Sequence, residues 1–359
     1  MKYLASLLVV ALLVVEGVFY AHPAAALSAP QCQQQDVVVA LAAGQAPAYH
    51  LAGWLCWQGT LADKTVQLLT PGGTYDHTYW DFSLQPDVYS YVRAATAQGY
   101  ATFNYDRLGT GLSDHPAPLA VTFPAETYIL HQLVQQTRAG TITGAPVTKV
   151  LHVGHSYGSM VAVNEAATYH DVDGVVLTGF THAAGIPGTV LGAVTSTVPT
   201  QLDPKFASAN LPIGYTTTLA GTRGLSFYNT AFADPAVIAQ DESLKQTATT
   251  GESLTLTPGL SASLSQQIAA PVLLAVGQKD QVFCTPTIAA ESCNDTATVL
   301  ARENSDFSPS ACLEAYVQPD AGHVIALHPN APAGFAAMLD WANRRVGASA
   351  TQAATDPCQ

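Results

Sequence analysis

The chain has 359 residues, of which 48% are hydrophobic and only 11% are charged, with 13 Lys and Arg against 26 Asp and Glu. This apolar content is sufficient for a large buried core. A formal net charge of −13 without any basic cluster argues against nucleic acid and anionic membranes as partners.

Residues 1–26 are expected to be a secretory signal peptide and not part of the fold. Lys2 gives a short basic start, residues 4–15 are uncharged and mostly apolar, and small residues at 24–26 offer a cleavage site. The apolar run is shorter than the roughly 20 residues that span a membrane. We therefore predict a secreted, extracellular protein without stable membrane insertion after signal removal. About 330 residues follow, enough for one large α/β domain with an insertion or for two small domains.

The mature chain is expected to begin with strands and then to alternate strands with helices. Such alternation indicates an α/β fold with a mostly parallel central sheet flanked by helices. The expected strands cover residues 36–41, 48–57, 65–70, 100–105, 150–153, 174–178, 272–276 and 315–317, and the expected helices cover residues 88–98, 127–139, 159–167 and 335–345.

The alternation stops between residues 184 and 266. This segment is rich in Thr, Pro, Gly and Ala, and short helices are expected near 235–238 and 263–268. Long segments between strands of a compact domain usually cover a binding site. We therefore predict a largely helical cap at 184–266, inserted between two core segments at 27–183 and 267–359. The alternative is a helical decoration without a catalytic role.

Six cysteines lie beyond the signal peptide. An even number in an exported chain favours three disulfides, for which fifteen pairings are possible. The cysteines lack C-x-x-C spacing, and no His/Cys cluster indicates zinc, so no metal is expected. Closeness in sequence favours the pairs Cys32–Cys56 and Cys284–Cys293, which leaves Cys312–Cys358.

Residues Gly154-His155-Ser156-Tyr157-Gly158 form a G-x-S-x-G pentapeptide between an expected strand and an expected helix. A strand, a sharp turn and a helix with serine at the apex is the context of a nucleophile elbow. Glycines are needed because side chains at their positions would collide with the neighbouring strand and helix. The alternative is a chance match in a chain with 27 glycines.

A serine becomes a nucleophile only beside a base, which an acid orients. In elbow enzymes these residues follow one another as Ser, Asp or Glu, and His. Asp280 follows the expected strand 272–276, and His323 follows the expected strand 315–317. Loops at the carboxyl ends of parallel strands build sites. We therefore predict Ser156 as nucleophile, Asp280 as orienting acid and His323 as general base.

Each role has rivals. Asp320 is a rival acid, although its closeness to His323 suggests a turn residue, and Glu291 is another, in a small loop between two cysteines. The rival bases are His155, His182 and His328. His155 lies inside the elbow and should point away from the serine, His182 lies near the cap, and His328 lies beyond the strand end.

An oxyanion hole needs two preorganised N–H donors. We expect one from the backbone of Tyr157 and the other from Gly73, in the loop Pro71-Gly72-Gly73-Thr74 after the third strand. Thr74, His77 and Trp80 are predicted to contact the substrate. The alternatives are an ordinary turn for the Pro-Gly-Gly segment, and core positions for the aromatic side chains that follow it.

Residues 106–114 contain two glycines after an expected strand, which could indicate a phosphate-binding loop. The segment lacks the third glycine of G-x-G-x-x-G, and no Walker lysine follows. We interpret it as a structural loop braced by Arg107.

Together, these motifs resemble the α/β-hydrolase superfamily, in its branch with an inserted cap and with secreted, esterase-like members. The resemblance covers about residues 66–345. Two departures matter. Pro71 stands where the family usually has histidine in a His-Gly pair, so other contacts must hold the oxyanion loop, and Leu108 stands where proline or arginine is usual. The matching segments are the elbow at 154–158, the D-R-x-G-x-G-x-S loop at 106–113, the G-x-x-D acid loop at 277–280 and the terminal G-H at 322–323.

The resemblance implies a secreted serine hydrolase that cleaves a small-molecule carboxylic ester through an acyl-enzyme on Ser156, without a cofactor. With the same triad, the alternatives are amide or peptide cleavage, lactone hydrolysis, acyl transfer and perhydrolysis. A non-catalytic binding protein on the same fold is a further alternative, but such proteins typically lose a triad member. The sequence gives no indication of the oligomeric state.

Overall fold

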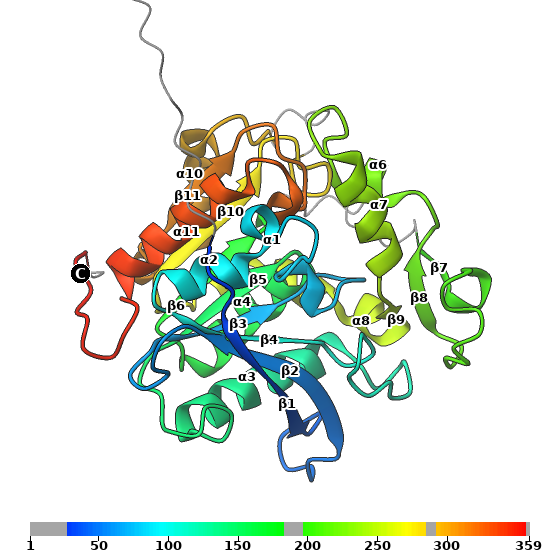
Figure 1. Cartoon of the computed structure of the whole chain (residues 1–359), viewed down its shortest axis with the longest axis horizontal. Coiled ribbons are helices and arrows are strands. Elements are labelled where there is room, and N and C mark those ends of the chain that lie inside the picture. The colour runs from blue at the N-terminus through cyan, green and yellow to red at the C-terminus, as the bar shows by residue number, and fades with distance from the viewer. Residues whose placement is uncertain (1–26, 183–196, 285–291, 357–359) are drawn as a thin grey trace, which may run out of the picture.

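The computed structural model describes residues 27–182, 197–284 and 292–356. The expected signal peptide lies outside these residues. The central sheet has eight strands in the order β1-β2-β4-β3-β5-β6-β10-β11 (Figure 1). Its strands are β1 (Gln31–Val39), β2 (Tyr49–Trp57), β3 (Val66–Thr70), β4 (Ala101–Tyr105), β5 (Val150–His155), β6 (Gly174–Thr178), β10 (Val272–Gly277) and β11 (Glu314–Gln318).

The predicted mostly parallel sheet is confirmed. β1 pairs antiparallel with β2, and β2 with β4, whereas all the other neighbouring strands are parallel. The five central strands β4, β3, β5, β6 and β10 are buried along their whole length. Strands buried on both faces have continuous apolar runs instead of alternation, which is why the sequence located them.

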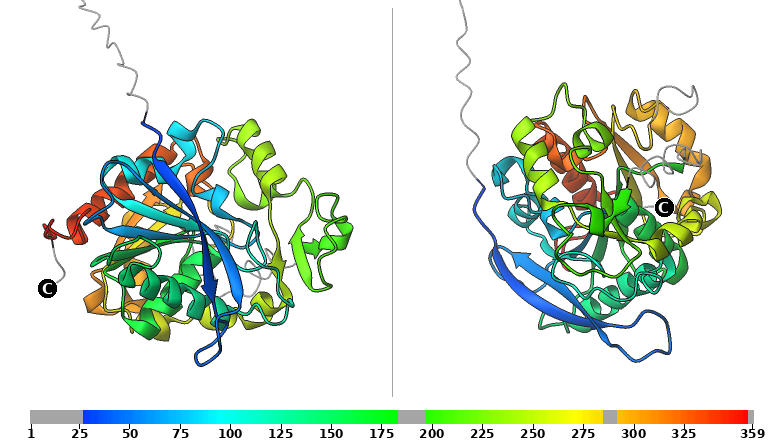
Figure 2. Two further views of the ribbon diagram at one scale, coloured as in Figure 1. Left: turned by 60° about the horizontal axis from the view of Figure 1, so that its bottom comes forward. Right: turned by 90° about the vertical axis from the view of Figure 1, so that its right-hand side faces the viewer.

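Helices cover both faces of this sheet, which lies between them in Figure 2. On one face pack α1 (Pro86–Tyr89), α2 (Tyr91–Ala97) and α11 (Ala331–Arg345), and on the other pack α3 (Phe123–Ala139) and α4 (Tyr157–Tyr169). α3 begins after Thr122, whose side chain accepts a hydrogen bond from the N–H of Ala125, and ends at Gly140 with φ 83°. These are ordinary N-cap and C-cap signals.

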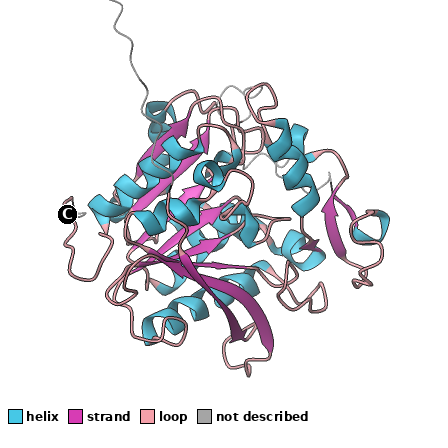
Figure 3. Cartoon of the chain, in the orientation of Figure 1, coloured by secondary structure: helices cyan, strands magenta, loops and turns pink. Residues whose placement is uncertain are grey.

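An insertion separates β6 from β10, although the two strands are neighbours in the sheet. Its described part, residues 197–266, is called the cap below. Short helices α6 (Arg223–Phe227), α7 (Pro235–Leu244), α8 (Thr250–Thr255) and α9 (Ala262–Ser265) accompany a small antiparallel sheet of β7 (Thr197–Pro199), β8 (Tyr215–Thr218) and β9 (Ala248–Thr249). Figure 3 shows the strands of this small sheet to one side of the central sheet.

Helix α10 (Thr296–Glu303) has eight residues and packs beside β11 at the sheet edge. None of the helices in the described ranges has the length and apolar character that crossing a bilayer requires. Short 3-10 turns are η1 (His77–Tyr79), η3 (Thr200–Leu202), η4 (Thr257–Leu260), η5 (Asn304–Asp306), η6 (Pro309–Ala311) and η7 (Ile325–Leu327).

Two of the expected disulfides are present. Cys32–Cys56 joins β1 to β2, and Cys284–Cys293 closes a loop after β10. Cys312 is also disulfide-bonded, while Cys358, its expected partner, lies outside the described residues.

Candidate active site

Ser156 lies at the sharp turn between β5 and α4. Its backbone has φ 52° and ψ −117°, a strained conformation for a residue with a side chain. The turn is held because the N–H of Ser156 donates to the carbonyl of Thr178 on β6 at 2.8 Å. A Cβ on Gly154 would lie 2.6 Å from the carbonyl oxygen of Gly158, and a Cβ on Gly158 would overlap the carbonyl oxygen of Thr70. The turn therefore requires glycine at both positions.

His323 and Asp280 form a buried pair beside this turn. The Nδ1 atom of His323 lies 2.9 Å from Oδ2 of Asp280, and both side chains are almost completely buried. The other oxygen of Asp280 accepts hydrogen bonds from the N–H groups of Val282 (2.7 Å) and Phe283 (3.1 Å). A carboxylate can only accept, so Nδ1 of the imidazole is the donor in this pair, and in the neutral imidazole the lone pair then lies on Nε2.

Ser156 and His323 line one cavity of about 820 Å³, counting its open mouth. The cavity lies between the core and the cap. Its only carboxylate among the described lining residues, that of Glu252, is paired with the Arg107 guanidinium. Apolar side chains make up most of the wall: Tyr157, Met160, Phe227, Leu256, Val282 and Phe283. Threonine hydroxyl groups come from Thr74, Thr197, Thr216 and Thr218.

The expected oxyanion donors, Tyr157 and Gly73, both line this cavity. Within the described residues, neither backbone N–H donates to a protein acceptor. Backbone N–H groups that line an open cavity without a protein acceptor can donate to water or to a bound ligand. The loop passes close to the serine, since a Cβ on Gly72 would lie 3.2 Å from the Cβ of Ser156. The two N–H groups are thus available at the place where an oxyanion would form.

Of the three predicted substrate contacts, only Thr74 lines the cavity. The structure places His77 and Trp80 outside it. His77 stacks on Trp54, with ring centroids 3.6 Å apart, and its Nδ1 lies 2.7 Å from Oδ1 of Asp106. Trp80 is fully buried in the core. Closeness to the oxyanion loop in sequence therefore does not place a side chain in the cavity.

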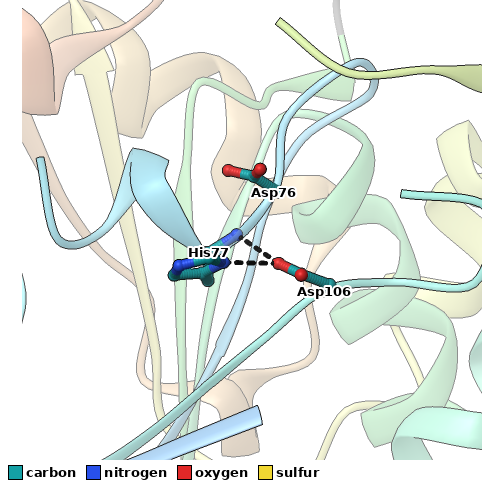
Figure 4. A group of neighbouring side chains, drawn as sticks. All are labelled: Asp76, His77 and Asp106. Atoms are coloured by element: carbon teal, nitrogen blue, oxygen red, sulfur yellow. Dashed lines mark hydrogen bonds and ion pairs between the residues drawn. The ribbon is translucent and has the colours of Figure 1, made fainter. Parts of the chain in front are cut away.

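Asp76, His77 and Asp106 have the side-chain types and proximity of a metal site (Figure 4). Their carboxylate oxygens already accept hydrogen bonds from this chain. Asp106 accepts from the N–H groups of His77 (2.9 Å) and Leu112 (2.8 Å), and Asp76 accepts from Thr78 (2.9 Å) and Gln246 (2.7 Å). The cluster therefore fastens the segment after the oxyanion loop to the 106–114 loop.

Two of the rival histidines have structural partners. Nε2 of His328 accepts from the N–H groups of Gly322 (3.0 Å) and Asn229 (3.2 Å), and burial lowers the pKa of His328. It thereby holds the loop that carries His323. His182 bonds to Glu303 (2.7 Å) and to Ser265 (2.8 Å).

The third rival, His155, lies beneath His323, with ring centroids 4.8 Å apart. Burial, and then the His323 ring, lower the pKa of His155 well below its usual value, so it stays neutral. Asp320 is exposed on a turn with φ 56°. Glu291 lies outside the described residues.

Comparison with known proteins agrees with this architecture. A family profile described as the alpha/beta hydrolase family matches residues 67–338. The chain belongs to the alpha/beta hydrolase family. No curated protein is similar enough in sequence to match.

Several solved structures share the fold at low sequence identity. An esterase from Exiguobacterium antarcticum has a TM-score of 0.57 at 15% identity, over 82% of this chain and 95% of its own. A lipase in an open form has a TM-score of 0.58 at 17% identity, over 88% of this chain and 99% of the lipase chain. A monoacylglycerol lipase from Paleococcus ferrophilus has a TM-score of 0.50 at 16% identity, over 82% and 98%.

Proposed function

We propose that this protein is a secreted serine hydrolase that cleaves carboxylic esters through an acyl-enzyme on Ser156. The observation that carries the proposal is the buried Asp280–His323 pair, whose imidazole lines the same cavity as Ser156 in its strained turn. The expected signal peptide and the disulfides support export. The esterase and lipase folds among the similar structures agree with ester chemistry.

The reaction follows from the positions of these groups. Oγ of Ser156 attacks the ester carbonyl carbon while Nε2 of His323 takes the hydroxyl proton. Asp280 stabilises the imidazolium, and the N–H groups of Tyr157 and Gly73 bind the oxyanion of the tetrahedral intermediate. The imidazolium then protonates the leaving alcohol. Water, deprotonated by His323, releases the acid and restores the serine.

The cavity wall indicates the kind of substrate. Most of the described lining is apolar, and its one carboxylate, that of Glu252, is paired with Arg107. A neutral ester with an apolar acyl or alcohol part matches such a wall, because burial of its apolar surface supplies the binding energy.

The test is covalent labelling of the folded, secreted protein with a fluorophosphonate, together with hydrolysis of p-nitrophenyl esters. We expect labelling and turnover in the wild type, and the loss of both in Ser156→Ala, with turnover reduced at least 10³-fold. Ser243→Ala removes an exposed serine on α7 and is the matched control; it should retain both signals.

Labelling or turnover that survives in Ser156→Ala contradicts the proposal. A panel of esters, lactones and aminoacyl amides then separates ester cleavage from amide and lactone hydrolysis. Assays with an added alcohol or hydrogen peroxide detect acyl transfer and perhydrolysis.

A further inference from the structure

The oxyanion loop, residues 71–74, contains an unfavourable backbone conformation. Thr74 has φ 61°, in the left-handed region, where a β-branched residue is a rare outlier. Such conformations persist only when surrounding contacts fix them. Pro71 cannot supply a side-chain hydrogen bond, so the contacts must come from elsewhere.

Arg223, on α6 of the cap, makes the contacts to Thr74. Its side chain is fully buried, and Nη1 donates to Oγ1 of Thr74 at 3.0 Å and to its carbonyl oxygen at 3.4 Å. The guanidinium also lies 4.1 Å from the ring centroid of Tyr75. A single cap residue therefore contacts the side chain and the backbone of Thr74 and the ring that follows it.

Asp241, on α7, fixes Arg223 in this position. Nε and Nη2 of the arginine bond to the two carboxylate oxygens at 3.0 and 3.1 Å, a bidentate geometry that defines the orientation of the guanidinium. Oδ2 of Asp241 also accepts from the hydroxyl groups of Tyr75 (3.2 Å) and Tyr228 (2.9 Å). The N–H of Gln246, also in the cap, donates to the carbonyl of Thr74 at 2.9 Å.

A second arginine connects the other side of the loop to the cap. Nη2 of Arg107 donates to the carbonyl of Gly72 at 3.2 Å, and Nη1 pairs with Glu252 on α8. The same guanidinium lies 4.7 Å from the ring centroid of Tyr157. Both expected oxyanion donors are thus adjacent to groups that the cap holds.

We propose that the cap holds the oxyanion loop in its working conformation, and that Arg223 is the positioning residue. Cap docking and completion of the oxyanion hole are then one event, and a cap that moves away from Thr74 would leave Ser156 without its second donor. This inference rests on the proposed function and adds a role for the cap.

The experiment compares two variants with one control. Arg223→Lys keeps the charge beside Asp241 but cannot bridge to Thr74 at the same time, and Thr74→Val keeps the side-chain shape but loses the acceptor Oγ1. Arg138→Lys is the control, since Arg138 bonds to Asp171, Asp173 and Thr148 near the start of β5, opposite Ser156.

Arg223→Lys and Thr74→Val are expected to lower kcat at least tenfold and to change KM less than threefold, because loss of an oxyanion donor typically costs 10²–10³-fold in kcat. Affinity for a trifluoromethyl ketone, which forms a tetrahedral adduct, should fall by a similar factor. Amide hydrogen exchange in residues 70–76 should accelerate. Arg138→Lys should change none of these quantities.

Unchanged exchange in Arg223→Lys overturns the inference, whatever the activity. If hydrogen exchange accelerates in the variants but kcat is unchanged, the link to catalysis is overturned. The link is also overturned if the variants lose thermal stability and nothing else. A wild type that cleaves no ester and takes no fluorophosphonate refutes the proposed function instead, while hydrogen exchange still decides whether the cap holds the loop.

Discussion

Asp280 is close to His323 in space, whereas Asp320 is close to it in sequence. Asp280 is distant in sequence but bonds to the imidazole at 2.9 Å, whereas Asp320 is three residues away and exposed. Its left-handed backbone, with φ 56°, belongs to a turn. Sequence proximity alone would have favoured Asp320. The rule that loops at the carboxyl ends of parallel strands build sites led to Asp280.

The two carboxylates provide a matched test at the residue scale. Asp280→Asn is expected to lower kcat about 10³–10⁴-fold with little change in KM, because an amide can donate to Nδ1 and thereby favours the wrong imidazole tautomer. Asp320→Asn should leave kcat unchanged, since asparagine tolerates the left-handed region. Steady-state hydrolysis of a p-nitrophenyl ester measures both variants. Similar losses in the two would contradict the assignment of Asp280.

A motif specifies a backbone position, whereas closeness in sequence to a loop does not. Ser156, Asp280 and His323 came from motifs that end strands, and the fold brings those strand ends together. His77 and Trp80 came only from closeness to a loop, which does not tell which way a ring faces. Cavity residues from the cap, such as Phe227 and Thr218, have no motif and require the three-dimensional fold.

At the scale of elements, every expected strand is present, and the five central strands are buried along their whole length. Buried runs of apolar residues are distinctive in a sequence. The small cap sheet was missed, since its strands have only two to four residues, too few for an alternating pattern. α10 was missed as well. Among its eight residues only Val299 and Glu303 are buried, so its apolar face is too narrow to detect in the sequence.

α3 and α4 are joined by a titratable contact. Nδ1 of His131, on α3, lies 2.9 Å from Oδ2 of Asp171 and 3.6 Å from Oε1 of Glu165, which belongs to α4. Burial disfavours the charged imidazole, but the two carboxylates outweigh it and raise the pKa of His131 to about 9. This folded-state pKa lies above the value of about 6.5 expected in the unfolded chain. The contact therefore stabilises the fold fully below pH 6.5 and less as the pH rises toward 9.

His131→Gln should remove this pH-dependent part. The substitution should lower the free energy of unfolding more at pH 6 than at pH 9.5. The two losses should differ by on the order of 1 to 2 kcal/mol, after allowance for partial exposure of the ring. Urea unfolding at the two pH values measures the difference. His170→Asn, at an exposed residue that ends α4 with φ 52°, is the control. A difference for His131→Gln that does not depend on pH would contradict a charged imidazole.

At the scale of the whole molecule, the site is shared between the core and the cap. The sequence supplied the core part, because its motifs follow a family pattern in chain order. It also predicts an insertion, through the loss of alternation between strands and helices. Contacts across the two parts, such as Arg223 with Thr74, join segments 149 residues apart, and no local pattern encodes them.

The disulfides Cys32–Cys56 and Cys284–Cys293 differ in their relation to the cavity. Cys32–Cys56 joins the outer strands β1 and β2, and neither cysteine lines the cavity. Cys284 follows Phe283, which lines it, and the N–H of Cys284 donates to the carbonyl of Asp280 at 3.1 Å. The second disulfide therefore restrains the loop that carries Asp280, the proposed orienting acid, whereas the first restrains only the sheet edge.

Replacing each pair by serines should separate stability from activity. The sequence separations of 24 and 9 residues correspond to a loss of roughly 3 kcal/mol in the free energy of unfolding for either pair, because the unfolded chain gains entropy. The Cys32→Ser, Cys56→Ser variant should keep its kcat/KM at 25 °C, where it is still folded. The Cys284→Ser, Cys293→Ser variant should lose several-fold in kcat/KM, because Asp280 is then held less firmly against His323. Thermal unfolding and ester hydrolysis on the same samples measure both effects, and equal kcat/KM in the two variants would show that the acid loop is rigid without its disulfide.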